Sequence, residues 1–388
     1  MRLYKTELYK LCRRKIFPIG IFCILAALLI LFLQDLRATR STVNGVTYHG
    51  YEAVRIDRQI TQEFEGVLTD SKIQQIVDQY GFPKQVEKYY GVSDGNFLNR
   101  FVMAYASDGY LHGWDDYRLA TKTLPLAETG LGQFREETGD GIWFAYYDGW
   151  SSYTERYYIS LIMTCSLILC TVSTVFSDEL QSGIKPLLFT TKEGPARDIC
   201  AKIAVAFTLS FGLWLMITGF SLLLYGVVYG WEGLQCLSSL VSDFSQPVMP
   251  FGTLLTRILL SGLLGVMELC AVTLLISARC RSTFHSVTVA AFCWVLPVAA
   301  FLALRGIIRI LLAAALEESV LRIWGLVLFP IQLLLYSAPF YLTNPDIISE
   351  LDAVSSNQGV PAFCIVTVLA VVIIAMGITS AWRRYRKY

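Results

Sequence analysis

The sequence predicts an α-helical protein that crosses a membrane several times, and three observations carry this prediction. The chain has 388 residues, of which 54% are hydrophobic and only 16% are charged. Its mean hydropathy is +0.50, and a soluble chain of this size could not bury that much apolar surface in one core. Several apolar runs also reach the roughly 20 residues that a helix needs to cross a bilayer.

Six such runs predict an α-helical polytopic membrane protein with six transmembrane helices. The predicted spans are residues 16–34, 157–176, 203–228, 253–277, 286–304 and 361–382. The first run is too long for the apolar part of a signal peptide, and no Ala-x-Ala cleavage site follows it. We therefore interpret it as an uncleaved first span.

The distribution of charge predicts the orientation in the membrane. Residues 1–15 carry a net charge of +5, the turn 278–285 carries +2 and the tail 383–388 carries +4. Residues 35–156 contain 12 Lys/Arg and 18 Asp/Glu, a net charge of −6. Because basic segments stay on the cytoplasmic side, we expect a multi-pass protein of the plasma (cytoplasmic) membrane with both termini cytoplasmic.

The first 15 residues are expected to form an interfacial helix on the cytoplasmic face. Leucines recur there at near-helical spacing, and Lys5, Lys10 and Arg13 supply a basic side that would face lipid headgroups. The alternative is a frayed basic tail whose positive charge only reflects the rule that basic segments stay on the cytoplasmic side.

Residues 35–156, between spans 1 and 2, predict a large extracytoplasmic domain of mixed α and irregular structure. We expect a helix over 69–80, capped by Asp70 or Ser71, and a second helix over 84–90 after Pro83. Six aromatic residues near the return to the membrane are typical of an interfacial belt. They are Tyr146, Tyr147, Trp150, Tyr153, Tyr157 and Tyr158.

The outer segment 305–360, before span 6, has two interpretations. Residues 306–316 are too short to cross, and residues 323–342 are long enough but contain Pro330 and Pro339. Either both pieces enter as a re-entrant hairpin or both cross, since a single crossing would move the basic tail outside. We favour the hairpin, because prolines suit backbone that is buried against protein. Residues 229–252 form the remaining outer loop.

The residues exclude several classes of function. The three histidines show no metal-ligand spacing. Residues 91–95 match the pattern Gly-x-Ser-x-Gly, but we expect no nucleophile elbow there. No Gly-Lys dipeptide occurs, so the chain carries no P-loop. No cysteine pair suggests a disulfide framework, metal site or redox site, and the near-neutral total charge of +1 argues against a nucleic-acid binder. We expect no catalytic, metal or cofactor site.

The most informative inner segment is the loop 177–202. Asp178 and Glu179 suit a helix N-terminus, and Leu180, Ile184 and Leu187 follow at a spacing of three to four residues. This pattern predicts a short amphipathic helix at the membrane face, suited to a groove on a partner protein. The alternative is an ordinary loop that covers helix ends.

In its order of parts, the chain resembles the permease subunit of a type-2 ABC transporter, of the bacterial exporter type. The resembling features are a basic N-terminal Leu-Tyr-Lys helix, six spans and a loop of the form Phe-x-x-Glu-x-x-x-Gly…Arg-x-x-x-x-Lys. In this sequence the loop residues are Phe176, Glu179, Gly183, Arg197 and Lys202. A Ser-x-x-x-Arg turn follows span 4, with Ser277 and Arg281 at these positions.

This resemblance implies that residues 177–202 contain a coupling helix, seated in a separate ATP-hydrolysing subunit. A second permease copy, or a homologous permease, would complete the transporter, and ATP would be bound by the partner alone. The residues expected at the coupling site are Phe176, Glu179, Gly183, Leu187, Arg197 and Lys202. The substrate would leave the cell between the two permeases.

Charged residues within spans are further candidates, because charge in hydrocarbon is costly. Glu268 is expected near mid-depth of span 4, where it would serve a transport path or a structural polar network. Arg257, nearer the outer end, would join the path or extend to the headgroups. Arg305 and Arg309 are expected to pair with Glu317 or Glu318.

A function of another class stays open at this point. The chain could be a membrane-anchored receptor or sensor whose outer domain binds a ligand. Six spans with two embedded half-spans are more than an anchor needs, which favours the transporter. An intramembrane enzyme is disfavoured further, because no paired catalytic set is present.

Overall fold

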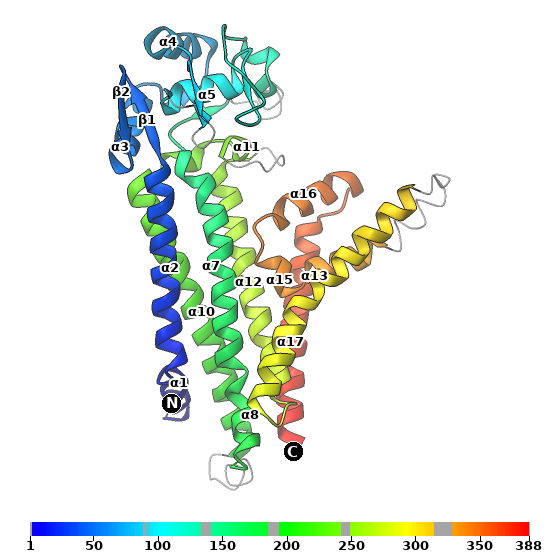
Figure 1. Cartoon of the computed structure of the whole chain (residues 1–388). Coiled ribbons are helices and arrows are strands. Elements are labelled where there is room, and N and C mark those ends of the chain that lie inside the picture. The colour runs from blue at the N-terminus through cyan, green and yellow to red at the C-terminus, as the bar shows by residue number, and fades with distance from the viewer. Residues whose placement is uncertain are drawn as a thin grey trace. The chain divides into compact units, whose positions relative to one another are not determined.

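The computed structural model describes residues 2–87, 91–92, 94–132, 141–184, 194–241, 249–313 and 328–387. The chain is mostly helical (Figure 1). Its contacts divide it into two compact units, and each is described by itself. Unit 1 comprises Met1–Ala26, Tyr157–Gly219 and Arg257–Tyr388, and unit 2 comprises Ala27–Arg156 and Phe220–Thr256.

Six helices among the described residues are long and apolar enough to cross a membrane, as predicted. They are α2 (Ile16–Ala38), α7 (Asp148–Val172) continued by α8 (Thr174–Gln181), α10 (Gly194–Tyr229), α12 (Phe251–Ser277), α13 (Thr283–Ala313) and α17 (Ala362–Lys387). Most extend beyond the predicted spans, because hydropathy marks only the apolar part of a helix. An α-helix satisfies its own backbone hydrogen bonds, which is what a lipid environment demands.

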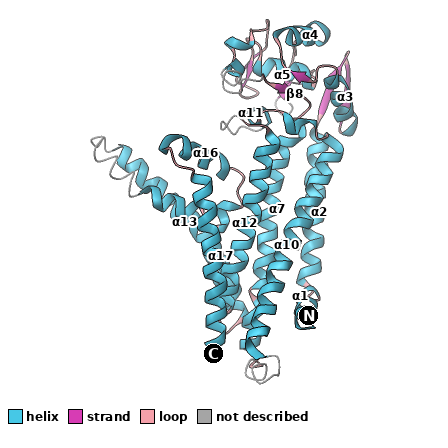
Figure 2. Cartoon of the chain, turned by 180° about the vertical axis from the view of Figure 1, so that it is seen from behind, coloured by secondary structure: helices cyan, strands magenta, loops and turns pink. Residues whose placement is uncertain are grey.

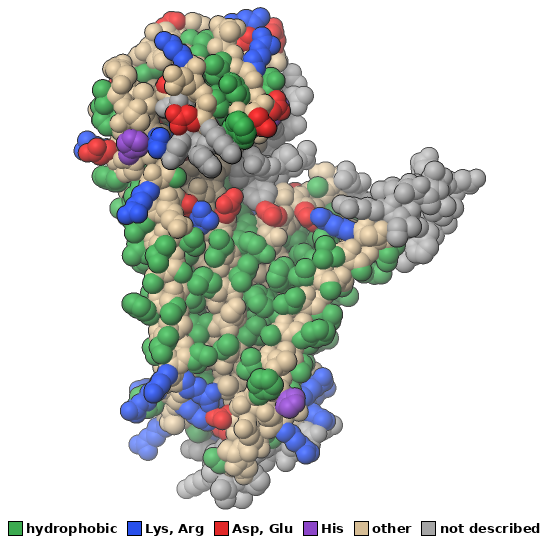
Figure 3. Space-filling model, in the orientation of Figure 1, with side chains coloured by type: hydrophobic (Ala, Val, Ile, Leu, Met, Phe, Trp, Pro, Cys, Tyr) green, Lys and Arg blue, Asp and Glu red, His purple; other side chains and the backbone are tan. Residues whose placement is uncertain are grey.

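Unit 1 also contains the N-terminal helix α1 (Arg2–Cys12), which confirms that this segment is helical. Both chain ends lie at one end of this unit (Figure 1). On the face that Figure 3 shows, hydrophobic side chains cover the long helices, and Lys and Arg side chains gather at the end that carries the termini. This segregation agrees with the charge pattern of the sequence.

The segment before α17 differs from the expected hairpin in one respect. Helix α13 continues without a break through Gly306 to Ala313, because Ala, Leu, Ile and Arg favour helix and one glycine costs only about 1 kcal/mol. Residues 328–336 are helical, followed by α15 (Pro339–Leu342) and α16 (Ile347–Gln358). Residues 314–327 lie outside the described part. Whether these segments re-enter or cross stays a prediction.

Unit 2 mixes helices with small antiparallel sheets (Figure 2), so the expectation of α and irregular structure alone was incomplete. Its helices include α3 (Tyr51–Gln62), α4 (Asp70–Tyr80), α5 (Phe97–Tyr105) and the short α11 (Ser238–Val241), with single turns at Leu126–Glu128 and Glu232–Gln235. Its two-stranded sheets pair β1 (Arg40–Val43) with β2 (Val46–His49), β3 (Gly66–Val67) with β8 (Trp143–Phe144), β4 (Val86–Glu87) with β5 (Gly91–Val92), and β6 (Tyr110–Leu111) with β7 (Tyr117–Arg118).

The β1–β2 hairpin turns at Asn44–Gly45, with φ of 52° and 78°. Positive φ at both central residues is the geometry that an Asn-Gly hairpin turn favours. Val43 pairs directly with Val46 across this turn. The hairpin is thus a local consequence of two residues.

The buried carboxylate of Asp57 joins three elements of unit 2. It lies on α3 with no exposed surface. Its Oδ1 accepts from Ser41 Oγ of β1 at 2.5 Å and from the Phe97 amide of α5 at 3.2 Å. Arg100 of α5 lies 3.4 Å from Oδ2. Burial is the main cause that raises the pKa of Asp57 to about 6.

A second polar contact in unit 2 joins the ends of three long helices. Arg156 of α7 binds Asp35 of α2 through two hydrogen bonds of 2.9 and 2.6 Å. Tyr225 of α10 donates to the same carboxylate at 2.6 Å. A two-point guanidinium–carboxylate contact fixes direction as well as distance.

Three sequence expectations for unit 2 were wrong. Helix α4 is capped by Thr69, whose hydroxyl accepts from the Lys72 amide, while Asp70 instead accepts from the amide of Leu126 at 2.7 Å. Residues 84–87 are not helical, because the amides of Lys84 and Gln85 bond to the Asp94 carboxylate and β4 joins β5. Residues 88–90 lie outside the described part.

The third concerns the aromatic belt. Within unit 2, Trp150 and Tyr153 have no exposed surface, and Tyr146 and Tyr147 are also buried. The Tyr153 ring lies 5.5 Å from Trp150 and 5.4 Å from Tyr225. In unit 1, Tyr157 is buried and only Tyr158 is partly exposed. These rings fill protein cores, since large aromatic side chains gain most from such packing.

Candidate functional site

The carboxylate of Glu179 is the centre of the candidate site. Glu179 lies in the last turn of α8, and its side chain is only 6% exposed. Lys10 Nζ donates to Oε1 at 3.2 Å, Lys202 Nζ lies 2.9 Å from Oε2, and the Tyr385 hydroxyl donates to Oε2 at 2.6 Å. One carboxylate therefore binds groups from helices α1, α10 and α17, all in unit 1.

Lys202 brings a second carboxylate into this site. Its side chain has no exposed surface, and it forms an ion pair with Asp198 one turn earlier on α10. Removing an ammonium group from water costs several kcal/mol. The two carboxylates and the nearby Tyr385 ring, 6.0 Å from Lys202 Nζ, offset that cost.

The N-terminal helix α1 contributes Glu7 and Lys10. Lys10 lies 3.8 Å from Glu7 as well as contacting Glu179. Burial raises the pKa of the Glu7 carboxyl above its ordinary value, although Lys202 and Lys10 oppose the shift. The expectation that Lys10 faces lipid headgroups was therefore wrong, since its ammonium group is directed to Glu179. We call these six residues the Glu179 cluster: Glu7, Lys10, Glu179, Asp198, Lys202 and Tyr385.

Helix α8 also forms hydrogen bonds to α12 and α13. Ser277 at the end of α12 accepts from the amides of Phe176 and Ser177 at 3.0 and 3.1 Å, and donates to the Ser173 carbonyl at 2.7 Å. Gln181 accepts from both the amide and the hydroxyl of Thr283, which begins α13. The Ser277 contact satisfies backbone groups at the junction between α7 and α8.

Phe176 of α8 also packs beside the Glu179 cluster. It has no exposed surface, and its ring lies 4.5 Å from the ring of Tyr385. Phe176, Glu179 and Lys202 were predicted to belong to one site, and the structure brings them together. A further ion pair joins Arg14, which follows α1, to Asp178 at 2.7 Å.

The other residues expected at the coupling site lie apart from this cluster or outside the described residues. Gly183 follows the end of α8 with a φ of +70°, where a helix commonly ends in a left-handed glycine. Arg197 is exposed on the first turns of α10. Leu187 lies outside the described residues.

The expected helix start at Asp178 and Glu179 was wrong, because both lie at the end of α8. Asp178 pairs with Arg14, which follows α1, and Glu179 pairs with Lys202 of α10, so neither side chain caps a new helix. Lys202, expected within the loop, lies on α10, which already begins at Gly194. The connection between α8 and α10 is therefore shorter than predicted.

The two charged residues of span 4 have different surroundings. Arg257 lies 3.2 Å from Asp352 of α16 and over the ring of Phe363, so neither a headgroup contact nor a path is needed to explain it. Glu268 is buried within α12, and its Oε2 has no hydrogen-bond partner among the described residues. Arg305 pairs with Glu350 at 2.9 Å. The expected pairing of Arg305 and Arg309 with Glu317 or Glu318 is not tested, because both glutamates lie outside the described residues.

Sequence reasoning missed Tyr385, Asp198, Glu7 and the role of Lys10. Tyr385 lies among the arginines of the C-terminal helix, and the argument for membrane orientation used only the Lys and Arg residues there. Asp198 and Lys202 have a spacing of four on a helix, a signal that was readable but usually marks an exposed pair. No sequence signal shows that four helices meet at Glu179.

Among the described residues, no group of three or more His, Cys, Asp or Glu side chains is arranged so that it could hold a metal ion. The Glu179 cluster is an ion-pair network around a buried carboxylate, and it joins the ends of several helices. No protein-family model matches the sequence. A search of the curated proteins likewise returns no match.

Proposed function

We propose that this chain is the membrane-spanning permease subunit of an ABC transporter, which exports a substrate using ATP hydrolysed by a separate subunit. The proposal places the protein in the plasma membrane with both termini cytoplasmic. A second permease, identical or homologous, completes the path. The order of sequence motifs and the six apolar helices support the class.

The observation that carries the proposal is the position of the Glu179 cluster. Glu179 lies four residues before Gly183, where the connection to α10 begins, and Lys202 lies near the start of α10. A force on this connection therefore acts on two helices that a buried ion pair joins. Through Lys10 and Tyr385 the same carboxylate binds α1 and α17.

Such a network suits coupling between a docked ATPase and the helices of the bundle. Coupling needs a packed contact whose arrangement both sites can bias. Glu179, Lys202 and Tyr385 are buried and contact one another, so moving one of their helix ends must move the others or break these contacts. A loop that only covered helix ends would need no such connection.

Affinity purification from native membranes, with a tag on the full chain, tests the proposal. We expect an ATPase that contains a P-loop to co-purify, together with vanadate-sensitive ATP hydrolysis. Glu179→Gln and Gly183→Ala should lower ATP hydrolysis or the recovery of the ATPase. Glu52→Gln, an exposed glutamate of unit 2, is the matched control and should change neither.

Absence of any ATPase from the wild-type complex would contradict the proposed class. If ATP hydrolysis and recovery of the ATPase were unchanged in both Glu179→Gln and Gly183→Ala, the Glu179 cluster would have no role in coupling. Specific ligand binding by the full chain without an ATPase would favour the receptor alternative.

A further inference from the structure

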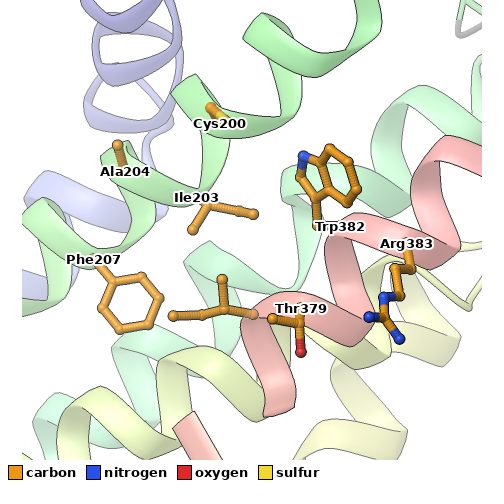
Figure 4. Close-up of a pocket in the computed structure, with 8 residues that line it drawn as sticks. Cys200, Ile203, Ala204, Phe207, Thr379, Trp382 and Arg383 are labelled. Atoms are coloured by element: carbon orange, nitrogen blue, oxygen red, sulfur yellow. The ribbon is translucent and has the colours of Figure 1, made fainter. Parts of the chain in front are cut away.

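A groove lies between α10 and α17 in unit 1 (Figure 4). Its volume is about 550 Å³, within the range of sites that hold small molecules. In Figure 4, Ile203 and Phe207 of α10 and Thr379 and Trp382 of α17 point toward the space between the helices. Cys200, Ala204, Ile378 and Arg383 complete the lining.

The groove has an apolar body and one cationic end. Arg383 is exposed, and within the described part of the chain its guanidinium group forms no hydrogen bond or ion pair. Trp382 lies beside it, with Arg386 stacked over the indole ring at 5.1 Å. Tryptophan and arginine at the end of an apolar helix are typical of the level of lipid headgroups.

The apolar lining continues along α17. Phe207 of α10 also lines a second hollow of about 530 Å³, whose other walls are mainly α12 and the part of α17 between Phe363 and Ile374. From Phe363 to Arg383 is 20 residues, or about 30 Å of helix, close to the thickness of the hydrocarbon layer. A lipid acyl chain that starts at Arg383 would therefore meet apolar protein surface over half the thickness of a bilayer or more.

We propose that this groove binds one anionic phospholipid, with the headgroup phosphate at Arg383 and an acyl chain along Ile203, Ala204 and Phe207. The apolar lining matches the hydrocarbon chain, and the exposed guanidinium group of Arg383 matches the phosphate in charge and hydrogen-bonding geometry. This site does not depend on the proposed transport function.

Charge disfavours a second copy of the chain as the occupant. A contact about a two-fold axis places the same surface on both partners. The α17 end carries Arg383, Arg384 and Arg386 in four residues. Two such ends facing each other would repel, whereas an anionic headgroup attracts each of them.

Native mass spectrometry of the full chain in detergent, titrated with palmitoyl-oleoyl phosphatidylglycerol, tests the site. The wild-type chain should retain one molecule, and Arg383→Ala should weaken this binding about fivefold, as expected for one lost basic contact. Ala204→Trp should abolish it, because the indole fills the groove from an exposed position. Two matched controls should bind normally: Arg281→Ala, an exposed arginine outside the groove, and Leu215→Trp, an exposed position elsewhere on α10.

A second readout uses the cysteines of the wild-type chain. Cys200 lines the groove, whereas Cys364, also exposed, does not. Phosphatidylglycerol should slow maleimide modification of Cys200 and leave Cys364 unchanged. Inorganic phosphate in large excess should neither protect Cys200 nor displace the lipid.

Three results would overturn the proposal. If the wild-type chain retained phosphatidylcholine as well as phosphatidylglycerol, the proposed headgroup contact would be wrong. If Ala204→Trp retained phosphatidylglycerol as well as the wild-type chain does, the lipid would not bind in this groove. Efficient Cys200-to-Cys200 cross-linking between copies, unaffected by phosphatidylglycerol, would assign the groove to a second copy.

Discussion

Tyr385 donates a hydrogen bond to Glu179 across 206 positions of sequence, with 2.6 Å between the phenol oxygen and Oε2. The Tyr385 side chain is fully buried, and its ring also packs against Phe176, one turn before Glu179 on α8. The end of α17 is therefore joined to the end of α8 by one polar and one aromatic contact.

The Tyr385→Phe variant removes only the polar contact and keeps the ring. Because hydrogen bonds to charged groups contribute about 1.5–3 kcal/mol, we expect the free energy of unfolding to fall by that amount. Thermal and chemical unfolding of the full chain in detergent measures it. The matched control is Tyr117→Phe, an exposed tyrosine of β7, which should change stability by less than about 0.5 kcal/mol. Equal effects of the two variants would show that the Tyr385 hydroxyl contributes nothing specific.

Replacing Lys202 should be more damaging than replacing Tyr385. Lys202→Met leaves the carboxylates of Glu179 and Asp198 without their shared cation in a buried site. Breaking one side of a buried ion pair costs about 3–5 kcal/mol, so the single variant should fold poorly. The double variant Lys202→Met with Asp198→Asn should recover part of this loss, because one fewer carboxylate is left unpaired. An exposed lysine, Lys5→Met, serves as the control, and a Lys202→Met chain as stable as this control would contradict the prediction.

Asp57 should make unit 2 less stable as the pH rises from about 4 to 6. Its pKa is raised to about 6 in the folded chain by burial, from 3.8 in an ordinary aspartate. The folded state therefore holds its proton longer, and stability contributed by this group is complete below pH 4 and lost as pH rises through 6. The difference of two pKa units corresponds to about 3 kcal/mol.

The measurement is the unfolding of unit 2 in the full chain as a function of pH, for instance by protease sensitivity. Asp57→Asn should flatten the decline between pH 4 and 6, because an amide does not titrate there. An exposed aspartate, Asp115→Asn, should leave the profile unchanged. If the stability of unit 2 fell equally with pH in the wild-type chain and in Asp57→Asn, groups other than Asp57 would cause the decline.

Two glycines in long helices should respond oppositely to alanine. A Cβ at Gly149 of α7 would overlap the ring of Tyr229, so Gly149→Ala should destabilise unit 2 by about 1–3 kcal/mol. A Cβ at Gly219 of α10 meets nothing within 4 Å, and Gly219→Ala should stabilise by about 0.5–1 kcal/mol through helix propensity. Thermal unfolding of the two variants checks both signs. A stabilising Gly149→Ala would mean that Tyr229 moves aside at no cost.

The six long helices could be predicted because each carries its own signal. An apolar run of about 20 residues has few alternatives to a membrane-spanning helix. The Asn44–Gly45 turn is a similar local choice, set by two residues. The predictions that failed were those in which a distant group changed a local preference: Asp70 bonds to Leu126 instead of capping α4, and Asp94 holds Lys84 and Gln85 out of a helix.

The candidate site was predicted only in part, for the same reason. A motif identified Phe176, Glu179 and Lys202, but the partners Lys10 and Tyr385 come from the two ends of the chain. Lys10 was counted only as a cation near the membrane face, and Tyr385 was given no role. Sequence patterns do not distinguish a cation that faces headgroups from one that pairs with a carboxylate of a distant helix.

The sequence by itself determined the six long apolar helices and which end of them is basic, because hydropathy and charge act on each segment independently. Tertiary structure alone decided which charges neutralise one another. It brought Lys10 and Lys202 to Glu179, Arg257 to Asp352, and left Arg383 exposed at the end of an apolar groove. The physical reason is that an ion pair depends on distance and burial, which only the packing of separate helices sets.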